Sequence, residues 1–327
     1  MAETIRWGIL STGRIANSFA EGLGALDDAE LAAVGSRRQA TAEEFAGKWN
    51  VPRAHGSYEA LAEDPDVDVI YVATPHSLHA ANSILCLRAG KAVLCEKPFT
   101  INAGQARQVV EVARSEGRFC MEAMWSRFLP TLTKLRELLA AGRIGEVRMV
   151  ISDFGFRAGY DAKGRLFDPA LGGGGLLDVG VYAVSMASMV LGGPPAEVAS
   201  LAEIGRTGVD EQAAAVLKHD SGRMAVILTG VRTSTPQETT VLGTEGMIRV
   251  EPAWWKGTEL TLRAGGQTER LELPYEGNGY NYEAAEVMRC LRDGRTESEV
   301  MPLDETVTIM ETLDAIRAQW PLKYPME

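Results

Sequence analysis

The feature that most constrains the fold is a regular alternation of short apolar segments with helical segments over the first 125 residues. Strands are expected at 5–11, 30–36, 67–74, 92–96 and 119–125, with helices between them at 14–23, 40–50, 77–89 and 103–116. Apolar strands separated by helices of this length are typical of a parallel sheet covered on both faces. The pattern therefore predicts a doubly wound, Rossmann-type α/β domain, whose ligands bind beyond the carboxyl ends of the strands.

The pattern changes after about residue 128. A helix is expected at 131–140, a strand at 148–156 and an apolar helix at 176–191, followed by strands at 213–219, 223–231, 238–243, 247–250, 259–263 and 269–273. Short turns that contain glycine favour antiparallel pairing of such strands. This part is therefore predicted to be an α+β domain with a large, mostly antiparallel open sheet.

The chain has 327 residues, enough for two domains. We expect a dinucleotide-binding domain at 1–125 and a substrate and dimerisation domain at 126–327. Two helices are expected near the end of the chain, at 282–292 and 303–320. The second of these is expected to pack back on the first domain.

Composition excludes several classes of partner. The formal net charge is −11, which argues against nucleic acid, because proteins that bind it present a basic face. The longest strongly apolar runs, such as 224–231, are expected to be too short to span a membrane, and we expect no secretory leader. The four cysteines lack metal-ligand spacing, so we predict free thiols, no metal and a cytoplasmic location.

A turn rich in small residues joins the first strand to the first helix. It reads Gly8-Ile-Leu-Ser-Thr-Gly13-Arg-Ile-Ala16, with serine at the first glycine position of the dinucleotide-binding pattern. Small residues there let the backbone approach a pyrophosphate, which meets free N–H groups at the helix N-terminus. Any tight strand–helix turn is the alternative interpretation. The candidate cofactor residues here are Ser11, Thr12, Gly13, Arg14 and Ile15.

The end of the second strand indicates which cofactor is used. An NAD enzyme usually has a carboxylate there to bind the ribose 2′-hydroxyl, but this chain reads Gly35-Ser36-Arg37-Arg38. Arginine forms bidentate, charge-assisted hydrogen bonds with phosphate. Ser36, Arg37 and Arg38 therefore favour NADP, with NAD as the alternative; an exposed arginine pair without a ligand is the simpler interpretation.

More polar residues follow the next strands and fall on the same edge of the predicted sheet. The segment Cys95-Glu96-Lys97-Pro98 follows one strand, and Thr74-Pro75-His76-Ser-Leu-His79 follows another. Each of these side chains has an ordinary alternative role in a turn or at a helix end. The cofactor candidates at this edge are Thr74, His76, His79, Glu96 and Lys97.

Gly172–Gly175 opens an apolar helix that carries Asp178 and Tyr182. Residues four apart on a helix share a face, so the pair suggests a site, but only together with the other features. A buried tyrosine otherwise packs in the core, and a lone aspartate is usually solvated.

These motifs together resemble the Gfo/Idh/MocA oxidoreductase family, along the whole chain and in order. The resemblance is greatest to the branch of dimeric dihydrodiol dehydrogenases and NADP-linked D-xylose dehydrogenases. The segments Glu96-Lys97-Pro98 and Met121-Glu-Ala-Met-Trp125-Ser-Arg127-Phe-Leu-Pro130 are characteristic of that branch. Tyr182 stands where many family members have histidine.

The resemblance implies hydride transfer between NADP and a hydroxyl of an aldose or a cyclic trans-dihydrodiol. Tyr182 would be the acid–base residue; a nearby ammonium such as Lys97 would favour its phenolate and lower its pKa, and Asp178 would orient substrate or Lys97. Aromatic residues would line the cleft, with core packing as the alternative for each, and Arg127 would contact substrate or fix Trp125. The substrate candidates are Trp125, Arg127, Phe154, Trp254 and Tyr280.

The resemblance also implies a homodimer formed through the open sheet of the second domain. Two other functions stay open at this point. A non-catalytic cofactor sensor of the same fold would not need both Lys97 and Tyr182. An NAD-dependent glycosidase of the family would be expected to have histidine in place of Tyr182.

Overall fold

The computed structural model describes residues 3–327. The chain forms two compact units. The first unit contains the residues up to Thr100 together with Gly104–Phe128 and Glu276–Thr306. The second contains Ile101–Ala103, Leu129–Tyr275 and Val307–Glu327.

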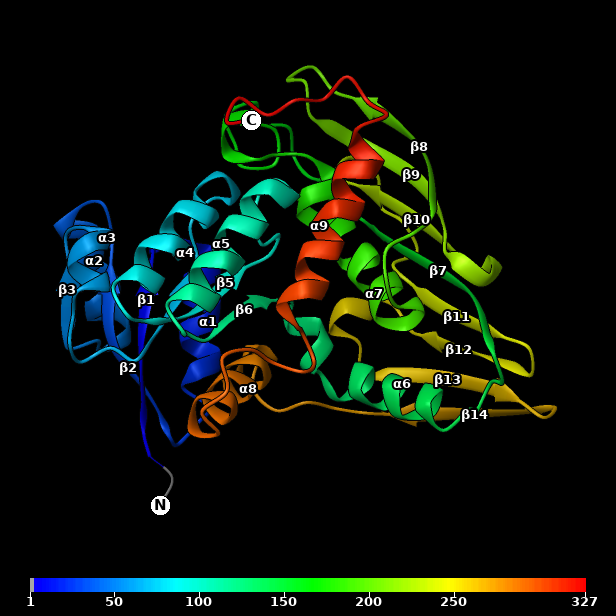
Figure 1. Ribbon diagram of the computed structural model, residues 1–327, viewed down its shortest axis with the longest axis horizontal. Helices are drawn as coiled ribbons and strands as arrows, with labels where there is room; N and C mark the ends of the chain where they lie inside the picture. Colours follow the sequence, from blue (N-terminus) through cyan, green and yellow to red (C-terminus); the bar gives the residue numbers. More distant parts are fainter. Residues whose placement is uncertain (1–2) are drawn as a thin grey trace. The chain divides into compact units, whose positions relative to one another are not determined.

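The first unit is built on a six-stranded sheet in the order β3-β2-β1-β4-β5-β6, and every strand pair in it is parallel. This confirms the predicted doubly wound fold (Figure 1). The strand order reverses between β1 and β4, where such folds bind their ligands. The strands are β1 (Ile5–Leu10), β2 (Ala29–Gly35), β3 (Arg53–His55), β4 (Val69–Val72), β5 (Ala92–Glu96) and β6 (Cys120–Ala123).

Helices and short turns connect these strands. Helix α8 packs against α1 and against the turn η2 that follows β6. The elements are α1 (Arg14–Leu23), α2 (Gln39–Trp49), α3 (Tyr58–Ala62), α4 (His79–Arg88), α5 (Ala103–Ser115) and α8 (Tyr280–Arg292), with 3₁₀ turns η1 (His76–Leu78) and η2 (Trp125–Phe128). The short elements β3 and α3 were not predicted, because three and five residues are too few to show a hydrophobic period.

The second unit is built on an eight-stranded sheet in the order β14-β13-β12-β11-β7-β10-β9-β8. Only β7 and β10 pair in parallel among its described strands, so the predicted mostly antiparallel sheet is confirmed. The strands are β7 (Val147–Gly155), β8 (Glu197–Ile204), β9 (Asp210–Lys218), β10 (Met224–Gly230), β11 (Thr239–Gly243), β12 (Gly246–Val250), β13 (Glu259–Ala264) and β14 (Gln267–Glu272). Edge strand β8 was missed, because it contains no fully buried side chain.

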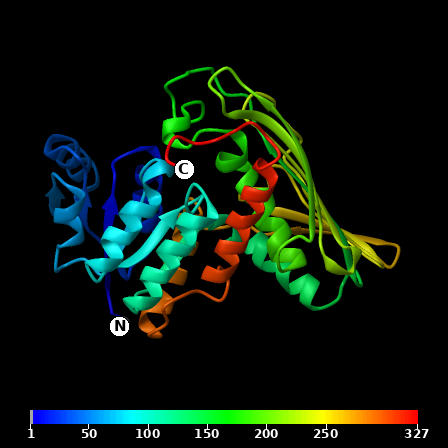
Figure 2. The same ribbon diagram turned by 45° about the horizontal axis from the view of Figure 1, so that its top comes forward.

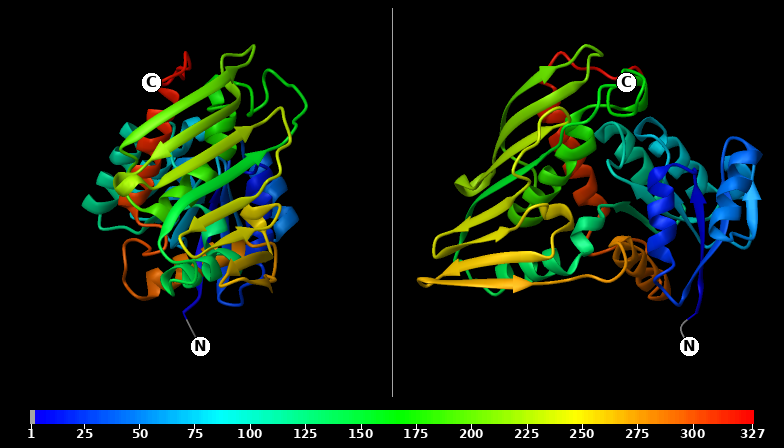
Figure 3. Two further views of the ribbon diagram at one scale, coloured as in Figure 1. Left: turned by 90° about the vertical axis from the view of Figure 1, so that its right-hand side faces the viewer. Right: turned by 180° about the vertical axis from the view of Figure 1, so that it is seen from behind.

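The helices of this unit lie on one face of the sheet and leave the other face uncovered (Figures 2 and 3). Helix α7 packs on β7 and β10, and α6 packs on β13. The helical elements are α6 (Pro130–Ala140), η3 (Pro169–Leu171), η4 (Leu176–Gly180), α7 (Val181–Leu191), η5 (Asp220–Gly222), η6 (Trp254–Lys256) and α9 (Leu303–Arg317).

One helical stretch, Pro169–Leu191, is long and apolar enough to cross a bilayer. The expectation that every apolar run falls far short of a membrane span is corrected by this stretch. However, 89% of its most apolar window is buried inside the protein. That burial is typical of a helix in the core of a globular domain.

The ends of the chain are divided between the units differently from our expectation. Helix α9 was expected to pack back on the first domain. Its first residues, up to Thr306, belong to the first unit, where Asp304 pairs with Arg114 at 2.9 Å, and residues from Val307 onward belong to the second unit. There Ser200 donates a hydrogen bond to the carbonyl of Ile316 at 2.8 Å. The whole segment 276–306 belongs to the first unit, so α8 returns to it together with the start of α9.

Candidate active site

The turn between β1 and α1 has the geometry of a phosphate cradle. Ser11 has a φ of 109°, a left-handed conformation that favours glycine. Gly13 precedes α1 with no side-chain cap and no acidic residue in the first turn. A Cβ added to Gly13 would find its nearest neighbour, Ser11 Oγ, at 3.9 Å. Open space beside free helix N–H groups suits the pyrophosphate of a dinucleotide, so these residues fit the cofactor.

Asn17 ties this turn to helix α2. Its Nδ2 donates to the carbonyl of Gly13 at 2.9 Å, and its Oδ1 accepts from Lys48 Nζ at 2.7 Å and from Trp49 Nε1 at 3.0 Å. Lys48 therefore brings a positive charge to the side chain that holds the turn. Asn17 and Lys48 were missed by sequence reasoning, since neither belongs to a recognised motif.

The end of β2 presents two exposed guanidinium groups. Ser36 is buried and its Oγ lies 2.6 Å from Thr41 Oγ1, while Thr41 also donates to the carbonyl of Arg38. Burial raises the pKa of Tyr58, and the nearby Arg37 partly opposes this. Arg37 and Arg38 are exposed, with no carboxylate between Ser36 and Gln39. The loop fits a 2′-phosphate.

His79 does not face a ligand, and its expected role as a cofactor residue is corrected. The side chain is 0% exposed, with Nδ1 2.8 Å from the carbonyl of Pro98 and Nε2 2.8 Å from the carbonyl of Thr74. Burial lowers the pKa of His79 to about 4, and the hydrogen bonds to the two carbonyls oppose this shift. A neutral ring has one N–H and donates to only one of the two carbonyls. It joins the loop after β4 to the turn after β5, and His76 packs edge-on against it.

Glu96 is also buried and stabilises the backbone beside Lys97. Its Oε1 accepts a hydrogen bond from the Tyr71 hydroxyl, and its Oε2 accepts from the backbone N–H of Lys97 at 3.1 Å. The ring of Tyr71 stacks on Phe19, with centroids 3.8 Å apart. Glu96 therefore orients the turn that carries Lys97.

In the first unit, two of the substrate candidates lie in contact with each other and a third is buried. Trp125 stacks on Tyr280, with ring centroids 4.6 Å apart and planes at 20°. Arg127 is 2% exposed; it donates to Glu305 Oε1 at 2.7 Å and to the carbonyl of Val300. A guanidinium buried in this way supports the fold, so the expected substrate contact of Arg127 is corrected to a structural role.

In the second unit, Asp178 and Tyr182 are both buried at the start of the apolar helix. Residues 176–180 form a π turn, and the α-helix begins at Val181, which corrects the expectation of a regular α-helix. Such turns recur at functional sites. Asp178 Oδ1 accepts a hydrogen bond from Arg165 Nη1 at 2.6 Å. The Arg165 side chain is 60% exposed, and sequence reasoning missed it because it lies in an irregular loop.

Aromatic rings surround Tyr182. The ring centroids of Phe154 and Tyr182 are 5.4 Å apart, and Trp254 lies edge-on to Tyr182 at 6.5 Å. Trp254 is 1% exposed and its indole N–H donates to the carbonyl of Asp153 at 2.8 Å. The adjacent Trp255 is half-buried and stacks on Phe154 with centroids 3.4 Å apart. Trp254 is therefore packed in the core, the alternative given for it, and Trp255 is the more exposed of the two indoles.

Comparison with known proteins gives the family. Residues 5–124 match the model of an oxidoreductase family with an NAD-binding Rossmann fold, and residues 132–249 match the Gfo/Idh/MocA C-terminal domain. The chain belongs to the Gfo/Idh/MocA family. Among its relatives, trans-1,2-dihydrobenzene-1,2-diol dehydrogenase is 40% identical in Mus musculus and 38% identical in Homo sapiens, over 99% of both chains in each case.

Solved structures of the family agree with this assignment. The aldose-aldose oxidoreductase from Caulobacter crescentus, complexed with glycerol, is 25% identical, with a TM-score of 0.89 over 97% of this chain and 99% of its own. A 3-ketoreductase from Actinomadura kijaniata in complex with NADP is 26% identical, with a TM-score of 0.86 over 97% and 98%. The chain is an NAD(P)-dependent oxidoreductase, as predicted, so a non-catalytic sensor is not favoured.

Proposed function

We propose that this chain is an NADP-dependent dehydrogenase that oxidises a ring hydroxyl of a cyclic trans-dihydrodiol. The observation that carries the proposal is the placement of Tyr182 at the start of α7, among Phe154, Trp254 and Trp255. A phenol can exchange a proton, and the exposed edge of an aromatic cluster stacks on the unsaturated ring of a dihydrodiol. The relatives named above as dihydrodiol dehydrogenases support this choice of substrate.

Tyr182 is the proposed proton acceptor. Its hydroxyl would take the proton of the substrate hydroxyl, while Asp178, held by Arg165, would accept a hydrogen bond from the neighbouring hydroxyl. We assign to Lys97 the cation that favours the phenolate and binds the substrate oxygen, following the family resemblance. When bound, the nicotinamide supplies the acceptor for the hydride that leaves the carbinol carbon.

The cofactor preference for NADP rests on the end of β2. Arg37 and Arg38 are exposed there, and Ser36 and Thr41 add hydroxyl groups beside them. A 2′-phosphate offers acceptors to both guanidinium groups, whereas the ribose 2′-hydroxyl of NAD finds no carboxylate in this loop to accept its hydrogen bond. The NADP-bound ketoreductase is a structural precedent.

An aldose is the second candidate substrate. The C–H faces of a sugar also stack on aromatic rings, and the similar solved structure of an aldose-aldose oxidoreductase carries glycerol, a small polyol. The aromatic cluster alone does not separate the two. A panel of trans-dihydrodiols, pentoses and hexoses, assayed with NADP and with NAD, is the direct test. Tight NADP binding without turnover of any substrate would refute the enzyme proposal.

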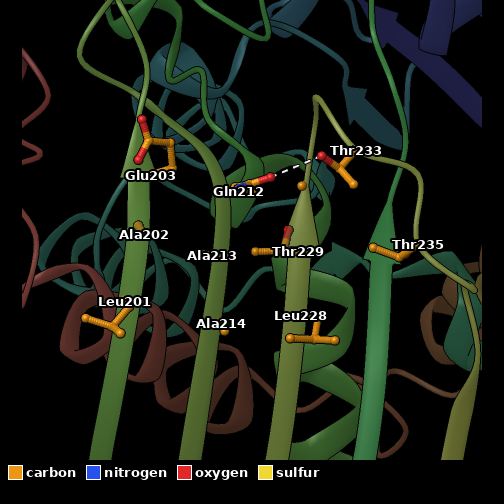
Figure 4. A pocket seen from close by; sticks show the side chains of 11 residues that line it. Leu201, Ala202, Glu203, Gln212, Ala213, Ala214, Leu228, Thr229, Thr233 and Thr235 are labelled. Atoms are coloured by element: carbon orange, nitrogen blue, oxygen red, sulfur yellow. Dashed lines mark hydrogen bonds between the residues drawn. The ribbon is translucent and has the colours of Figure 1, made fainter.

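We also propose that the second unit forms a homodimer through the uncovered face of its sheet. Large apolar side chains are exposed there, including Leu201 at 82%, and cross-strand register places Ile151, Val216 and Leu228 on this face. Figure 4 shows Leu201 and Leu228 along an open groove whose upper end is polar, with Gln212 bonded to Thr233. An exposed group of large apolar side chains of this kind marks an interface, and the family resemblance supports a second copy as the partner.

A further inference from the structure

The run of glycines before the catalytic helix is held by three buried side chains from distant parts of the second unit. Asp210 comes from the start of β9, Thr229 from β10, and Tyr324 from the segment after α9. Thr229 Oγ1 donates to the carbonyl of Gly175 at 3.0 Å, and the Tyr324 hydroxyl donates to the carbonyl of Gly173 at 2.7 Å. Each bond fixes the backbone just before η4.

Asp210 makes the contact nearest to the helix itself. Its side chain is 0% exposed, and Oδ2 accepts a hydrogen bond from the backbone N–H of Leu176 at 2.6 Å. Leu176 is the first residue of η4, and the preceding Gly175 offers no side-chain cap. An N–H at this position has no acceptor within its own helix, so Asp210 supplies the cap from another strand.

Gly174 is matched to this carboxylate. It has a φ of 117°, and a Cβ at this position would lie 2.3 Å from Asp210 Oδ1. Both the backbone conformation and the close approach therefore require glycine. The carbonyl of Gly174 accepts the backbone N–H of Asp178 at 3.2 Å. A displacement of the Gly174–Leu176 backbone would thus also displace Asp178, which is bonded to Gly174, and the turn before Tyr182.

We propose that Asp210 is a positioning residue for the reaction, which fixes the first turn of the catalytic helix and thereby the directions of Asp178 and Tyr182. The proposal rests on the function proposed above for Tyr182. Nothing requires Asp210 to touch substrate or cofactor. It acts through the Leu176 N–H, and its effect is confined to the second unit.

The surroundings of Asp210 give this contact a pH dependence. Burial raises the pKa of Asp210 to about 7, opposed by the N–H of Leu176 and by the charge of Arg317. Among the described residues, the Tyr324 hydroxyl also faces it, and Arg317 is itself paired with Asp314 and Glu327. The anion is the stronger acceptor for an N–H, so the cap weakens when the carboxyl is protonated.

The test compares Asp210→Asn and Asp210→Ala with a matched control, Asp168→Asn. Asp168 also caps a helical turn, accepting the N–H of Ala170 at 2.8 Å, but in η3 and not in the catalytic helix. Because small misplacements of reacting groups are costly, we expect kcat to fall about tenfold in D210N and further in D210A. The dissociation constant of NADPH should not change, and amide exchange at Leu176 should become faster.

The pH profile separates positioning from a general loss of stability. The wild-type kcat should rise through an inflection near the pKa of Asp210, and D210N should lose that inflection while remaining folded at the assay temperature. D168N should keep both kcat and the inflection. If D210N is folded and keeps the wild-type kcat and pH profile while Tyr182→Phe is inactive, the positioning role of Asp210 is overturned and the proposed function of Tyr182 stands. Normal turnover in Tyr182→Phe would overturn the proposed function as well.

Discussion

Arg165 Nη1 lies 2.6 Å from Asp178 Oδ1, which joins an exposed guanidinium to a buried carboxylate one helical turn from Tyr182. The guanidinium orients the carboxylate, and its own side chain is 60% exposed. This relationship makes Arg165 part of the candidate site, although it lies in an irregular loop with no recognisable motif.

Replacing Arg165 by alanine should therefore impair substrate use. Loss of the charge-assisted hydrogen bond to Asp178 is expected to lower kcat/KM for the diol about tenfold. NADPH binding should be unaffected, because the cofactor candidates are in the other unit. Steady-state kinetics with fluorescence titration of NADPH would measure both. The control is Arg143→Ala, which removes an exposed pair with Glu269 at 3.4 Å; equal losses in both variants would contradict the assignment.

Arg37 and Arg38 should determine the choice between the two nicotinamide cofactors. The double alanine variant removes both guanidinium groups at the end of β2, so the dissociation constant of NADP should rise by about one to two orders of magnitude. Affinity for NAD should change little, because it has no 2′-phosphate. Calorimetric titration with each cofactor measures the two dissociation constants and hence the preference for NADP over NAD. A variant that still prefers NADP as strongly as the wild type would remove the basis for the 2′-phosphate site.

Glu122 should make stability depend on pH. It is buried, and burial raises its pKa from the usual 4.5 to about 7. Between these values the folded chain binds more protons than the unfolded chain, so this group lowers stability as the pH rises, with the full cost present above about pH 7.

Glu122→Gln removes this ionisation and retains an acceptor for the Phe99 N–H, which lies 3.1 Å from Glu122 Oε1. Relative to wild type, the variant should gain on the order of 2–3 kcal/mol in unfolding free energy between about pH 4 and pH 8. Urea denaturation at both values measures the difference, with exposed Glu116→Gln as control. A constant difference between variant and wild type across this range would contradict the prediction.

Leu201→Asp should separate the proposed dimer. The side chain is largely exposed in the single chain, so a charge there should leave the fold intact. In a dimer it would be buried against the second copy, where an unpaired charge is strongly unfavourable. Light scattering after size exclusion should show a monomer for the variant and a dimer for the wild type. A monomeric wild type would rule out the proposed interface.

Much of the fold follows from hydrophobic pattern. The parallel sheet and the antiparallel sheet were both predicted, because their longer strands have clear apolar periods. The return of α8 to the first unit and the division of α9 between the two units were not predicted, because the partners of these helices depend on tertiary packing. The glycine run of 172–175 was visible in the sequence, but its partner Asp210 is 34 residues from Leu176 and no local pattern joins them.

The site residues were predictable where a motif fixes the backbone. They were less predictable where tertiary packing determines whether a side chain is buried or exposed. The turn at Ser11–Gly13 and the arginines after β2 lie where the pattern placed them. By contrast, Trp254 and Trp255 are neighbours of the same residue type, and only the fold decides that the first turns into the core. Arg127 and His79 belong to motif segments, yet their polar atoms are used to bond the chain to itself.

The most direct test of the proposed chemistry is turnover of trans-1,2-dihydrobenzene-1,2-diol with NADP by the wild type and by Tyr182→Phe. Phenylalanine keeps the ring contacts with Phe154 and Trp254 and removes only the hydroxyl. We expect NADPH formation by the wild type and a fall of about a hundredfold or more in kcat for the variant, with unchanged affinity for NADPH. Near-normal turnover by Tyr182→Phe would contradict the assigned acid–base role.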